Sequence, residues 1–208
     1  MNTDQFWYEK RVFITGHTGF KGAWLVTWLS SLGAIVKGYS LPPIGINNLF
    51  DIACAGENCE NTFNDIRDYS ALNSSLTAFQ PEIIFHMAAQ PLVLASYKNP
   101  IETYQVNVMG TANLLDAIRH YGSCKAIINI TTDKCYENNG SHSPYSESDP
   151  MGGYDPYSSS KGCSELITSA YRQSFLNDLG VGVATARSGN VIGGGDWADN
   201  RLIPDILK

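Results

Sequence analysis

A tyrosine and a lysine stand four residues apart in the segment Tyr157-Ser-Ser-Ser-Lys161. On a helix these two side chains share one face, one turn apart. An ammonium beside a phenol favours the phenolate and brings the phenol pKa from its usual value near ~10 toward neutrality. Such a pair can take a proton from a sugar or alcohol hydroxyl while a nicotinamide takes the hydride. A surface tyrosine and lysine on a serine-rich helix start would show the same letters, so the pair needs support from elsewhere.

A glycine-rich segment near the start of the chain gives that support. It follows the apolar run Arg11-Val-Phe-Ile-Thr15 and opens a helical pattern. Glycines there permit a tight turn, close approach of the backbone to a pyrophosphate and close packing of the helix on the strand. The helix start adds free N–H groups and a partial positive charge. We predict a dinucleotide-binding turn at Gly16, His17, Thr18, Gly19, Phe20, Lys21 and Gly22, in which His17 and Lys21 face the pyrophosphate.

The expected ends of the second and third strands concern the adenosine half of a dinucleotide. The second strand usually ends in an acidic residue that holds the ribose hydroxyls, but here Tyr39-Ser-Leu41 stand in that place. The residues alone therefore leave NAD and NADP both open. At the end of the third strand, we expect Asp65 and Ile66 to meet the adenine edge.

The fourth strand ends in His86-Met-Ala-Ala-Gln90. Small side chains at the carboxyl end of a strand leave room for a cofactor in the crevice there, so Ala88, Ala89 and Gln90 are predicted cofactor contacts. We expect His86 itself to be a packed histidine and not a base.

The fifth and sixth strands end in further polar residues. The Thr132 hydroxyl could bond the substrate oxygen that Tyr157 deprotonates, and Asp133 and Lys134 would supply further acid and base groups. An ordinary exit from a strand would show the same residues. After the sixth strand, Asn190 and Arg201 are candidate substrate contacts. The glycine-rich run 193–197 between them could fold over a ligand.

Short β-branched runs alternate with longer helical patterns and must position these groups. This alternation predicts an α/β fold, a Rossmann-like doubly wound parallel sheet with helices on both faces. Strands are expected at 11–15, 34–39, 62–65, 82–88, 125–131 and 181–187, and helices at 20–32, 70–79, 101–121 and 156–176. The segment 42–61 reads as a loop with a short helix. In the first helix the core spacing falls on Trp24, Leu25, Trp28, Leu29 and Leu32.

The helix predicted at 101–121 carries more apolar residues than one stripe needs. They are Val106, Met109, Leu114, Leu115 and Ile118. One face of this helix should pack on the sheet. The remaining apolar residues should contact either a neighbouring helix or a partner subunit in a homodimer or higher oligomer.

Composition narrows the class of protein further. The chain has 208 residues, which suits one domain with a substantial core, and a net charge of −6, which argues against a general nucleic-acid binder. It has no apolar run of ~18 residues and no signal-like start, so no membrane association is expected. The scattered cysteines, an odd set of 5, are expected as free thiols in a reducing cytoplasm, with no metal site.

With these motifs assembled, the chain resembles the extended short-chain dehydrogenase/reductases that act on nucleotide sugars. The resemblance covers essentially the whole chain and includes Asn107-Val-Met-Gly-Thr111 and Arg187-Ser-Gly-Asn190. The glycine turn, Thr131-Thr-Asp-Lys-Cys-Tyr136 and Gly189-Asn-Val-Ile-Gly-Gly-Gly-Asp-Trp197 resemble the branch that dehydrates CDP-hexoses. The resemblance implies NAD as hydride carrier, CDP-glucose as substrate and a role in making the deoxysugars of lipopolysaccharide O-antigen.

The resemblance also implies roles for the site residues. Tyr157, with Thr132 and Lys161, would remove the C4 hydroxyl proton, and Asp133 would protonate the departing C6 hydroxyl. Related dehydratases carry a glutamate as C5 base where this chain has Lys134.

The resemblance further implies two domains. Residues 1–190 would form the NAD-binding domain, and 191–208 would start a smaller substrate lobe that is largely absent. An epimerase or reductase of the same fold, or a non-catalytic NAD-binding protein, remain the alternatives.

Overall fold

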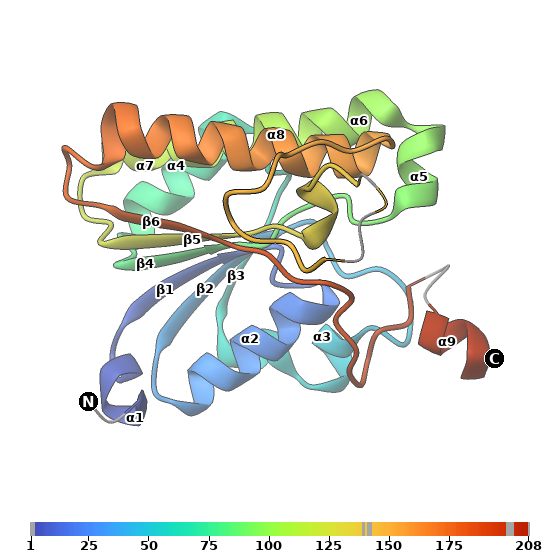
Figure 1. Cartoon of the computed structure of the whole chain (residues 1–208). Helices are drawn as coiled ribbons and strands as arrows, with labels where there is room; N and C mark the ends of the chain where they lie inside the picture. The colour runs from blue at the N-terminus through green and yellow to red at the C-terminus, as the bar shows by residue number, and fades with distance from the viewer. Residues whose placement is uncertain (1–2, 139, 141–142, 199–201, 208) are drawn as a thin grey trace.

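The structure is a computed structural model, and it describes residues 3–138, 140, 143–198 and 202–207. A single parallel sheet lies at its centre, with strands in the order β3-β2-β1-β4-β5-β6 (Figure 1). The strands are β1 (Arg11–Thr15), β2 (Ile35–Ser40), β3 (Glu60–Phe63), β4 (Ile83–His86), β5 (Ala126–Ile130) and β6 (Gly182–Ala186). The sequence-based prediction of a doubly wound parallel sheet is confirmed.

The strand order reverses between β1 and β4, which pair in register from Val12 with Ile83 to Thr15 with His86. In doubly wound sheets, the crevice outside the carboxyl ends of the strands at this reversal is the place where ligands bind. The turns after β1, β4, β5 and β6 all leave the sheet at that edge, so the topology brings together four of the segments that the sequence analysis selected.

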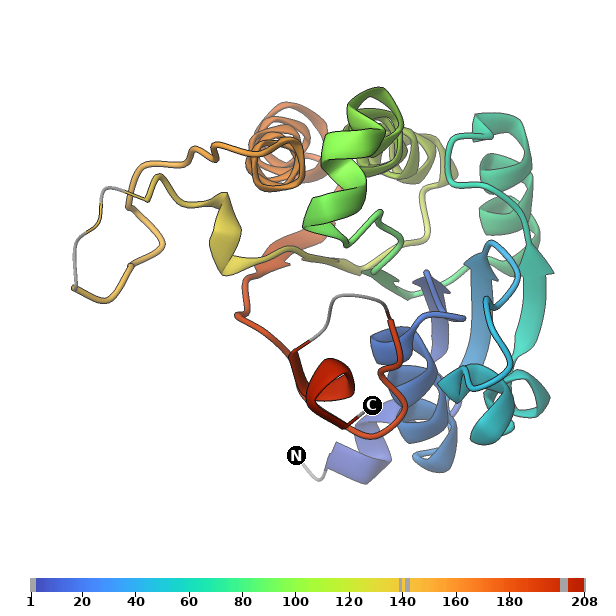
Figure 2. The ribbon, with the colours of Figure 1, turned by 90° about the vertical axis from the view of Figure 1, so that its right-hand side faces the viewer.

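Helices cover the sheet in two layers (Figures 1 and 2). On one side lie α2 (Phe20–Ser31) and α3 (Leu49–Ile52), and on the other lie α4 (Tyr69–Phe79), α7 (Gly110–Tyr121) and α8 (Pro156–Tyr171). Short helices complete the fold: α1 (Thr3–Trp7), α5 (Val93–Lys98), α6 (Pro100–Tyr104), α9 (Leu202–Leu207), and the 3-10 turns Ala55–Asn58 and Asp133–Cys135. One turn of π-helix joins α6 to α7 at Gln105–Met109, and another follows α8 at Arg172–Leu176.

Each helical layer encloses its own apolar core. Phe13 and Ile84 point to the α4 and α7 side, where they pack with Leu72 and Leu114, whereas Ile14 packs against α2 on the other side. The excess apolar residues of α7 are largely used within the fold, because Leu114, Leu115 and Ile118 are all buried. Met109 remains 54% exposed. Neighbouring helices therefore account for most of the excess.

The predicted core stripe of α2 is only partly right. Leu29 is fully buried, but Trp24 and Trp28 are 50% and 58% exposed. The helix packs on the sheet through Gly22, Ala23 and Val26 instead. A helix that starts at a glycine turn lies so close to its strand that small residues must face the sheet. The two bulky indoles are therefore displaced to the side of the contact.

Candidate functional site

The glycine turn after β1 is packed so closely that it excludes side chains. Gly16 has a φ of +73°, and a Cβ there would lie 2.7 Å from the backbone of Met87 and Ala88. A Cβ on Gly22 would lie 2.2 Å from the Gly16 carbonyl oxygen. Gly19 caps α2 with its backbone in an extended conformation and without a side-chain hydrogen bond. This cradle fits a pyrophosphate, because backbone N–H groups at the helix start can approach it without obstruction.

His17 takes no part in that cradle with its side chain. The ring is fully buried, stacked on Phe63 and edge-on to Phe50, and its Nε2 lies 3.1 Å from Asn61 Oδ1. Burial lowers the pKa of His17 to about 4, so the ring is neutral at physiological pH. The prediction that His17 faces the pyrophosphate is therefore wrong. Gly38 on β2 leaves the space that the ring fills.

The edge beyond β2 and β3 is held by local hydrogen bonds. The Thr18 hydroxyl lies 2.8 Å from the Ser40 hydroxyl and donates to the Leu41 carbonyl oxygen at 2.9 Å. The Arg67 guanidinium holds the Asp65 carboxylate and keeps its pKa below the usual value.

Two buried residues, Tyr39 and Ile66, lie beside Asp65. The Tyr39 phenol donates to the backbone oxygen of Asp65, and Ile66 is 5% exposed, next to Gly110. Contact of Asp65 and Ile66 with adenine stays a prediction.

The segment after β4 is fixed by a buried polar network. His86 lies between Thr15 and Thr111, at 2.7 Å and 3.0 Å, and burial lowers its pKa to about 3. His86 is thus a packed neutral histidine, as predicted. Thr15 Oγ1 also accepts the backbone N–H groups of Met87 and Ala88.

Farther along, the Gln90 amide bonds Thr103 and the Leu92 backbone. Its side chain therefore shapes the loop before α5.

Asn107 has no role in the sequence analysis beyond its place in a motif. In the structure it lies in the π-helical turn, buried, where its side chain bonds both the N–H and the C=O of Gln90 and donates to Ser160 Oγ at 2.8 Å. It thereby joins the loop after β4 to the helix that carries Tyr157 and Lys161. A buried asparagine in the middle of a helix irregularity gives no periodic signal, so only the fold reveals this contact.

Tyr157 and Lys161 lie where the helical spacing predicted, on the buried side of α8. Asp155 caps the helix by accepting the Ser158 N–H at 2.9 Å, and Pro156 occupies its first turn. Tyr157 is 8% exposed and Lys161 is 6% exposed. The Lys161 ammonium donates to the carbonyl oxygen of Ile130, the last residue of β5, at 3.4 Å. The helix therefore places both groups at the carboxyl edge of the sheet.

The surroundings of Lys161 disfavour its charge. Burial, and to a smaller extent the charge of Lys21, lower the pKa of Lys161 to about 8, while the charge of Glu165 acts in the opposite direction. A lysine with this pKa is still an ammonium at neutral pH, yet close enough to its pKa to share a proton with a neighbouring phenol. Lys21 thus lies near enough to Lys161 for the two charges to interact, which connects the glycine turn with the Tyr-Lys pair.

Thr132 lies 7% exposed at the start of the 3-10 turn after β5. Its hydroxyl donates to the Asp133 carboxylate at 3.1 Å and accepts the Lys134 N–H at 3.4 Å. Asp133 and Lys134 are exposed, and the Asp133 carboxylate lies beside Gly189. The three consecutive residues therefore form one compact polar turn beside the loop that follows β6.

One cavity of ≈1010 Å³ extends along the glycine turn, the polar turn after β5, the start of α8 and the loop after β6. Thr132, Lys134, Tyr157, Lys21 and Asn190 all line it. Residues of α5, of the loop at 189–197, and Ile203 and Pro204 of α9 also line this cavity. Asp133 is adjacent through its bond with Thr132. The contribution of α5 was missed, because its short helix between two loops has too few turns to show a period.

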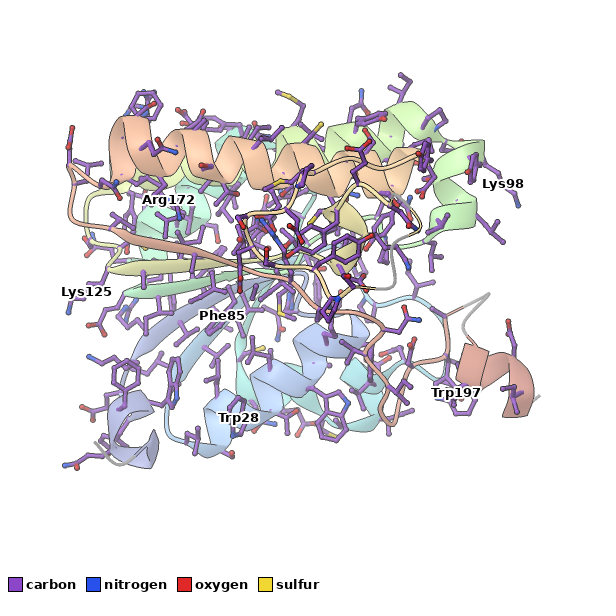
Figure 3. The ribbon with its side chains drawn as sticks, viewed as in Figure 1. Trp28, Phe85, Lys98, Lys125, Arg172 and Trp197 are labelled. Atoms are coloured by element: carbon purple, nitrogen blue, oxygen red, sulfur yellow. The ribbon has the colours of Figure 1, made fainter. Side chains whose placement is uncertain are left out.

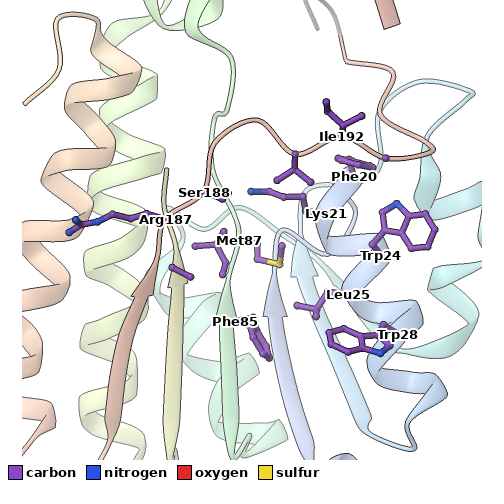
Figure 4. Close-up of a pocket in the computed structure, with 14 residues that line it drawn as sticks. Phe20, Lys21, Trp24, Leu25, Trp28, Phe85, Met87, Arg187, Ser188 and Ile192 are labelled. Atoms are coloured by element: carbon purple, nitrogen blue, oxygen red, sulfur yellow. The ribbon is translucent and has the colours of Figure 1, made fainter. Parts of the chain in front are cut away.

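A second cavity of ≈650 Å³ adjoins the first and is lined mainly by apolar side chains (Figure 4). Trp24 and Trp28 line it from α2, Phe85 and Met87 from β4 and the segment after it, and Lys21 lies at its upper end. The exposed side chains of Trp24 and Trp28 thus form part of the wall of this cavity. Arg201, a predicted substrate contact, lies outside the described residues.

The described residues also bear on metal binding and on membrane spanning. No group of three or more His, Cys, Asp or Glu side chains there is arranged to hold a metal ion. Among the helices described, none combines the length and apolar character that crossing a bilayer needs. All five cysteines, Cys54, Cys59, Cys124, Cys135 and Cys163, are free thiols.

The sheet order, the glycine turn and the Tyr-Lys helix define a Rossmann domain of the short-chain dehydrogenase/reductase type. The family model for GDP-mannose 4,6 dehydratase matches residues 13–190, so the chain belongs to that family of nucleotide-sugar dehydratases. The chain is 57% identical, over 98% of its length, to the CDP-glucose 4,6-dehydratase of Salmonella typhimurium, of which it covers 58%. It is 30% identical, over 90% of its length, to the CDP-paratose 2-epimerase of Salmonella typhi.

Solved structures show the same architecture. The dTDP-glucose 4,6-dehydratase of Streptomyces venezuelae, solved with NAD and TYD bound, aligns with a TM-score of 0.83 and 25% identity, over 95% of this chain and 61% of that one. The UDP-glucose 4-epimerase of Thermus thermophilus, solved with NAD, aligns with a TM-score of 0.76 and 28% identity, over 91% and 58%. The chain thus spans about three-fifths of the length of these relatives.

Proposed function

We propose that this chain is the cofactor-binding part of a CDP-D-glucose 4,6-dehydratase, which converts CDP-glucose to CDP-4-keto-6-deoxyglucose with NAD. The observation that carries the proposal is the single cavity that reaches from Lys21 at the glycine turn to Thr132, Lys134 and Tyr157. The 57% identity to the Salmonella typhimurium enzyme supports the choice of sugar nucleotide.

The residues present fit NAD. The cradle at Gly16 and Gly22 has no room for a Cβ, and Lys21 lies beside it to meet phosphate charge. Tyr157 lines the cavity, and Lys161 follows it by one turn of α8, where the pair would hold a nicotinamide ribose. Bound NAD would accept a hydride from the sugar C4 and later return it to C6.

The acid and base steps fall to the chain's own residues. Tyr157 removes the C4 hydroxyl proton, with Lys161 favouring the phenolate and Thr132 bonding the same oxygen. The resulting C4 ketone acidifies the C5 proton, which Lys134 accepts as a neutral amine in the cavity, while Asp133 protonates the C6 hydroxyl so that it leaves as water. Lys134 returns its proton to C5 when the hydride is added to C6. Lys134 is exposed and lines the cavity, so its side chain can contact a bound substrate.

We further propose the division of the chain at residue 190. Residues 1–190 hold the dinucleotide, and residues from 191 onward, of which 191–197, Ile203 and Pro204 line the cavity, begin the part that holds the sugar nucleotide. We place the protein in the cytoplasm, in the synthesis of deoxysugars for lipopolysaccharide O-antigen, and its unpaired cysteines agree with a reducing compartment.

An epimerase of the same fold is the second candidate, because the Salmonella typhi relative is an epimerase. The Asp133-Lys134 turn favours the dehydratase, since a simple epimerisation needs no groups for elimination across C5 and C6.

The test is incubation with CDP-glucose and NAD followed by mass spectrometry of the sugar nucleotide. The chain is assayed alone and also joined to the C-terminal remainder of the Salmonella typhimurium relative. Loss of 18 mass units, about one water, by the hybrid supports dehydration. An isomer of unchanged mass with altered sugar configuration would favour the epimerase, and NAD binding without any turnover by the hybrid would favour a non-catalytic protein.

A further inference from the structure

Glu165 and Arg187 form the most deeply buried ion pair among the described residues, and the proposed mechanism does not use it. Their side chains are 3% and 13% exposed. Arg187 Nε donates to Oε1 at 2.9 Å and Nη2 donates to Oε2 at 3.0 Å, so the guanidinium and the carboxylate meet through two parallel bonds. Figure 4 shows Arg187 directed toward the helical layer, away from Lys21 and the apolar cavity.

The pair connects three elements at the carboxyl edge of the sheet. Glu165 belongs to α8, Arg187 follows β6, and the Thr131 hydroxyl at the end of β5 donates to Glu165 Oε1. Arg187 also donates to the Tyr136 phenol at 2.8 Å and lies over its ring, 4.9 Å from the centroid. Burial alone would raise the pKa of Glu165, but the hydrogen bonds from Arg187 and Thr131 outweigh it and lower the pKa.

The same three elements carry the proposed catalytic groups. Glu165 follows Lys161 by one helical turn and Tyr157 by two, on one face of α8. Thr131 directly precedes Thr132. The backbone of Asp133 donates to the Ser188 oxygen at 3.1 Å, next to Arg187. A displacement of any one element would therefore change the distances among Tyr157, Lys161 and the polar turn.

We propose that Glu165 is a positioning residue which, through its paired bonds with Arg187 and its bond from Thr131, holds the Tyr157-Lys161 face of α8 against the ends of β5 and β6. This inference rests on the proposed function only for its effect on turnover. Arginine suits this place because its planar fork matches a carboxylate, which a lysine cannot do.

The pair also acts on Lys161 through charge. The groups whose charge acts on the buried ammonium, or on which it acts, are Glu165 on α8, His86 on β4 and Lys21 on α2. His86 is neutral and Lys21 repels the ammonium, so Glu165 is the carboxylate of this set that favours it. Removing the charge of Glu165 should therefore lower the pKa of Lys161 further.

Glu165→Gln is the decisive substitution, because it keeps the size of the side chain and its oxygen but removes the charge and one of the two paired bonds. We expect kcat to fall by about 10- to 100-fold, as for small misplacement of reacting groups, while KM for CDP-glucose changes less than about twofold. We also expect the Lys161 titration midpoint to fall by about one pH unit, read from lysine side-chain NMR and assigned with Lys161→Met. The alkaline limb of the pH–rate profile should move by the same amount.

Two further variants separate positioning from packing. Glu57→Gln, an exposed carboxylate beside α3, is the matched control and should change neither measurement. The double variant Glu165→Met with Arg187→Met fills the space with apolar side chains and leaves no unpaired charge. If it restores both kcat and the Lys161 midpoint, the pair is only packing and the inference is wrong. Persistent loss in a folded double variant supports it.

The titration requires neither substrate nor turnover, so it distinguishes this inference from the proposed function. A shifted Lys161 midpoint in a protein without dehydratase activity would support the electrostatic link and reject the proposed reaction. An unshifted midpoint together with an unchanged kcat in folded Glu165→Gln would overturn the inference. Should Glu165→Gln not fold, Arg187→Lys, which keeps the charge but not the paired bonds, replaces it with the same expected loss of kcat.

Discussion

The Lys161 ammonium donates to the backbone oxygen of Ile130 at 3.4 Å, across the gap between α8 and the last residue of β5. This bond fixes a buried positive charge at the carboxyl edge of the sheet, one helical turn from the Tyr157 phenol. It joins the helix that carries the proposed base to β5, the strand that Thr131 and Thr132 follow. The following predictions concern this edge and the glycine turn opposite it.

Tyr157→Phe should abolish turnover and leave NAD binding nearly intact. The hydroxyl is the proton acceptor in the proposed mechanism, and loss of a positioned base costs about 10²- to 10⁴-fold in rate. In the proposed function, cofactor affinity comes from the glycine turn and Lys161, which the substitution leaves in place. Turnover is measured by release of the 4-keto sugar and binding by titration calorimetry. Tyr154→Phe, at a tyrosine that is 87% exposed, is the control. Near wild-type turnover in Tyr157→Phe would show that the base is another residue.

Lys161→Met should stabilise the fold at neutral pH while it harms catalysis. The folded pKa of about 8 lies below the ordinary value of 10.5, so the unfolded chain binds more protons between these values and stability rises with pH across that window. The cost of the buried charge is fully present below pH ~8 and amounts to about 3 kcal/mol, from 1.36 kcal/mol per pKa unit. Urea unfolding should therefore show Lys161→Met to be more stable at pH 7, with the difference shrinking toward pH 10. A constant difference at both pH values would contradict the low pKa of Lys161.

Lys21→Ala should weaken NAD binding and flatten its dependence on salt, because phosphate charge at the helix start would lose a nearby cation. The affinity is measured by fluorescence titration at two or more salt concentrations. Lys125→Ala is the control, since Lys125 pairs with Glu82 at the opposite end of the sheet from Trp197 (Figure 3). An affinity and a salt slope equal to those of the wild type would place Lys21 outside the phosphate site.

Gly38→Ala should destabilise the protein by disturbing the buried His17 ring. The added Cβ would lie 2.1 Å from a ring carbon, and overpacking of a core costs about 1–3 kcal/mol. Gly182→Ala is the matched control on another strand, where the added Cβ would lie 3.5 Å from the Lys125 carbonyl oxygen. The free energies of unfolding in urea compare the two. Equal stability would mean that the His17 ring can move aside, and that its place in the core is not fixed.

The sequence by itself determined the architecture and supplied the candidate reacting groups. Strands form from short apolar runs, and helices show apolar residues at a longer spacing, so the order of the elements could be predicted. The first strand, β1, was predicted at its observed bounds, Arg11–Thr15. The Tyr157-Lys161 spacing and the glycine turn depend on local backbone geometry, which is encoded within a few residues. These features therefore needed no knowledge of distant contacts.

Tertiary structure alone decided which residues face the sheet and which side chains pair. Trp24 and Trp28 match a helical period, but the close approach of α2 to the sheet selects Gly22, Ala23 and Val26 for the contact. His17 is drawn into the core because Gly38, distant in sequence, leaves a space beside Phe50 and Phe63. Glu165 and Arg187 meet only because α8 packs across the ends of β5 and β6. Such contacts depend on the packing of whole elements, and no local pattern encodes them.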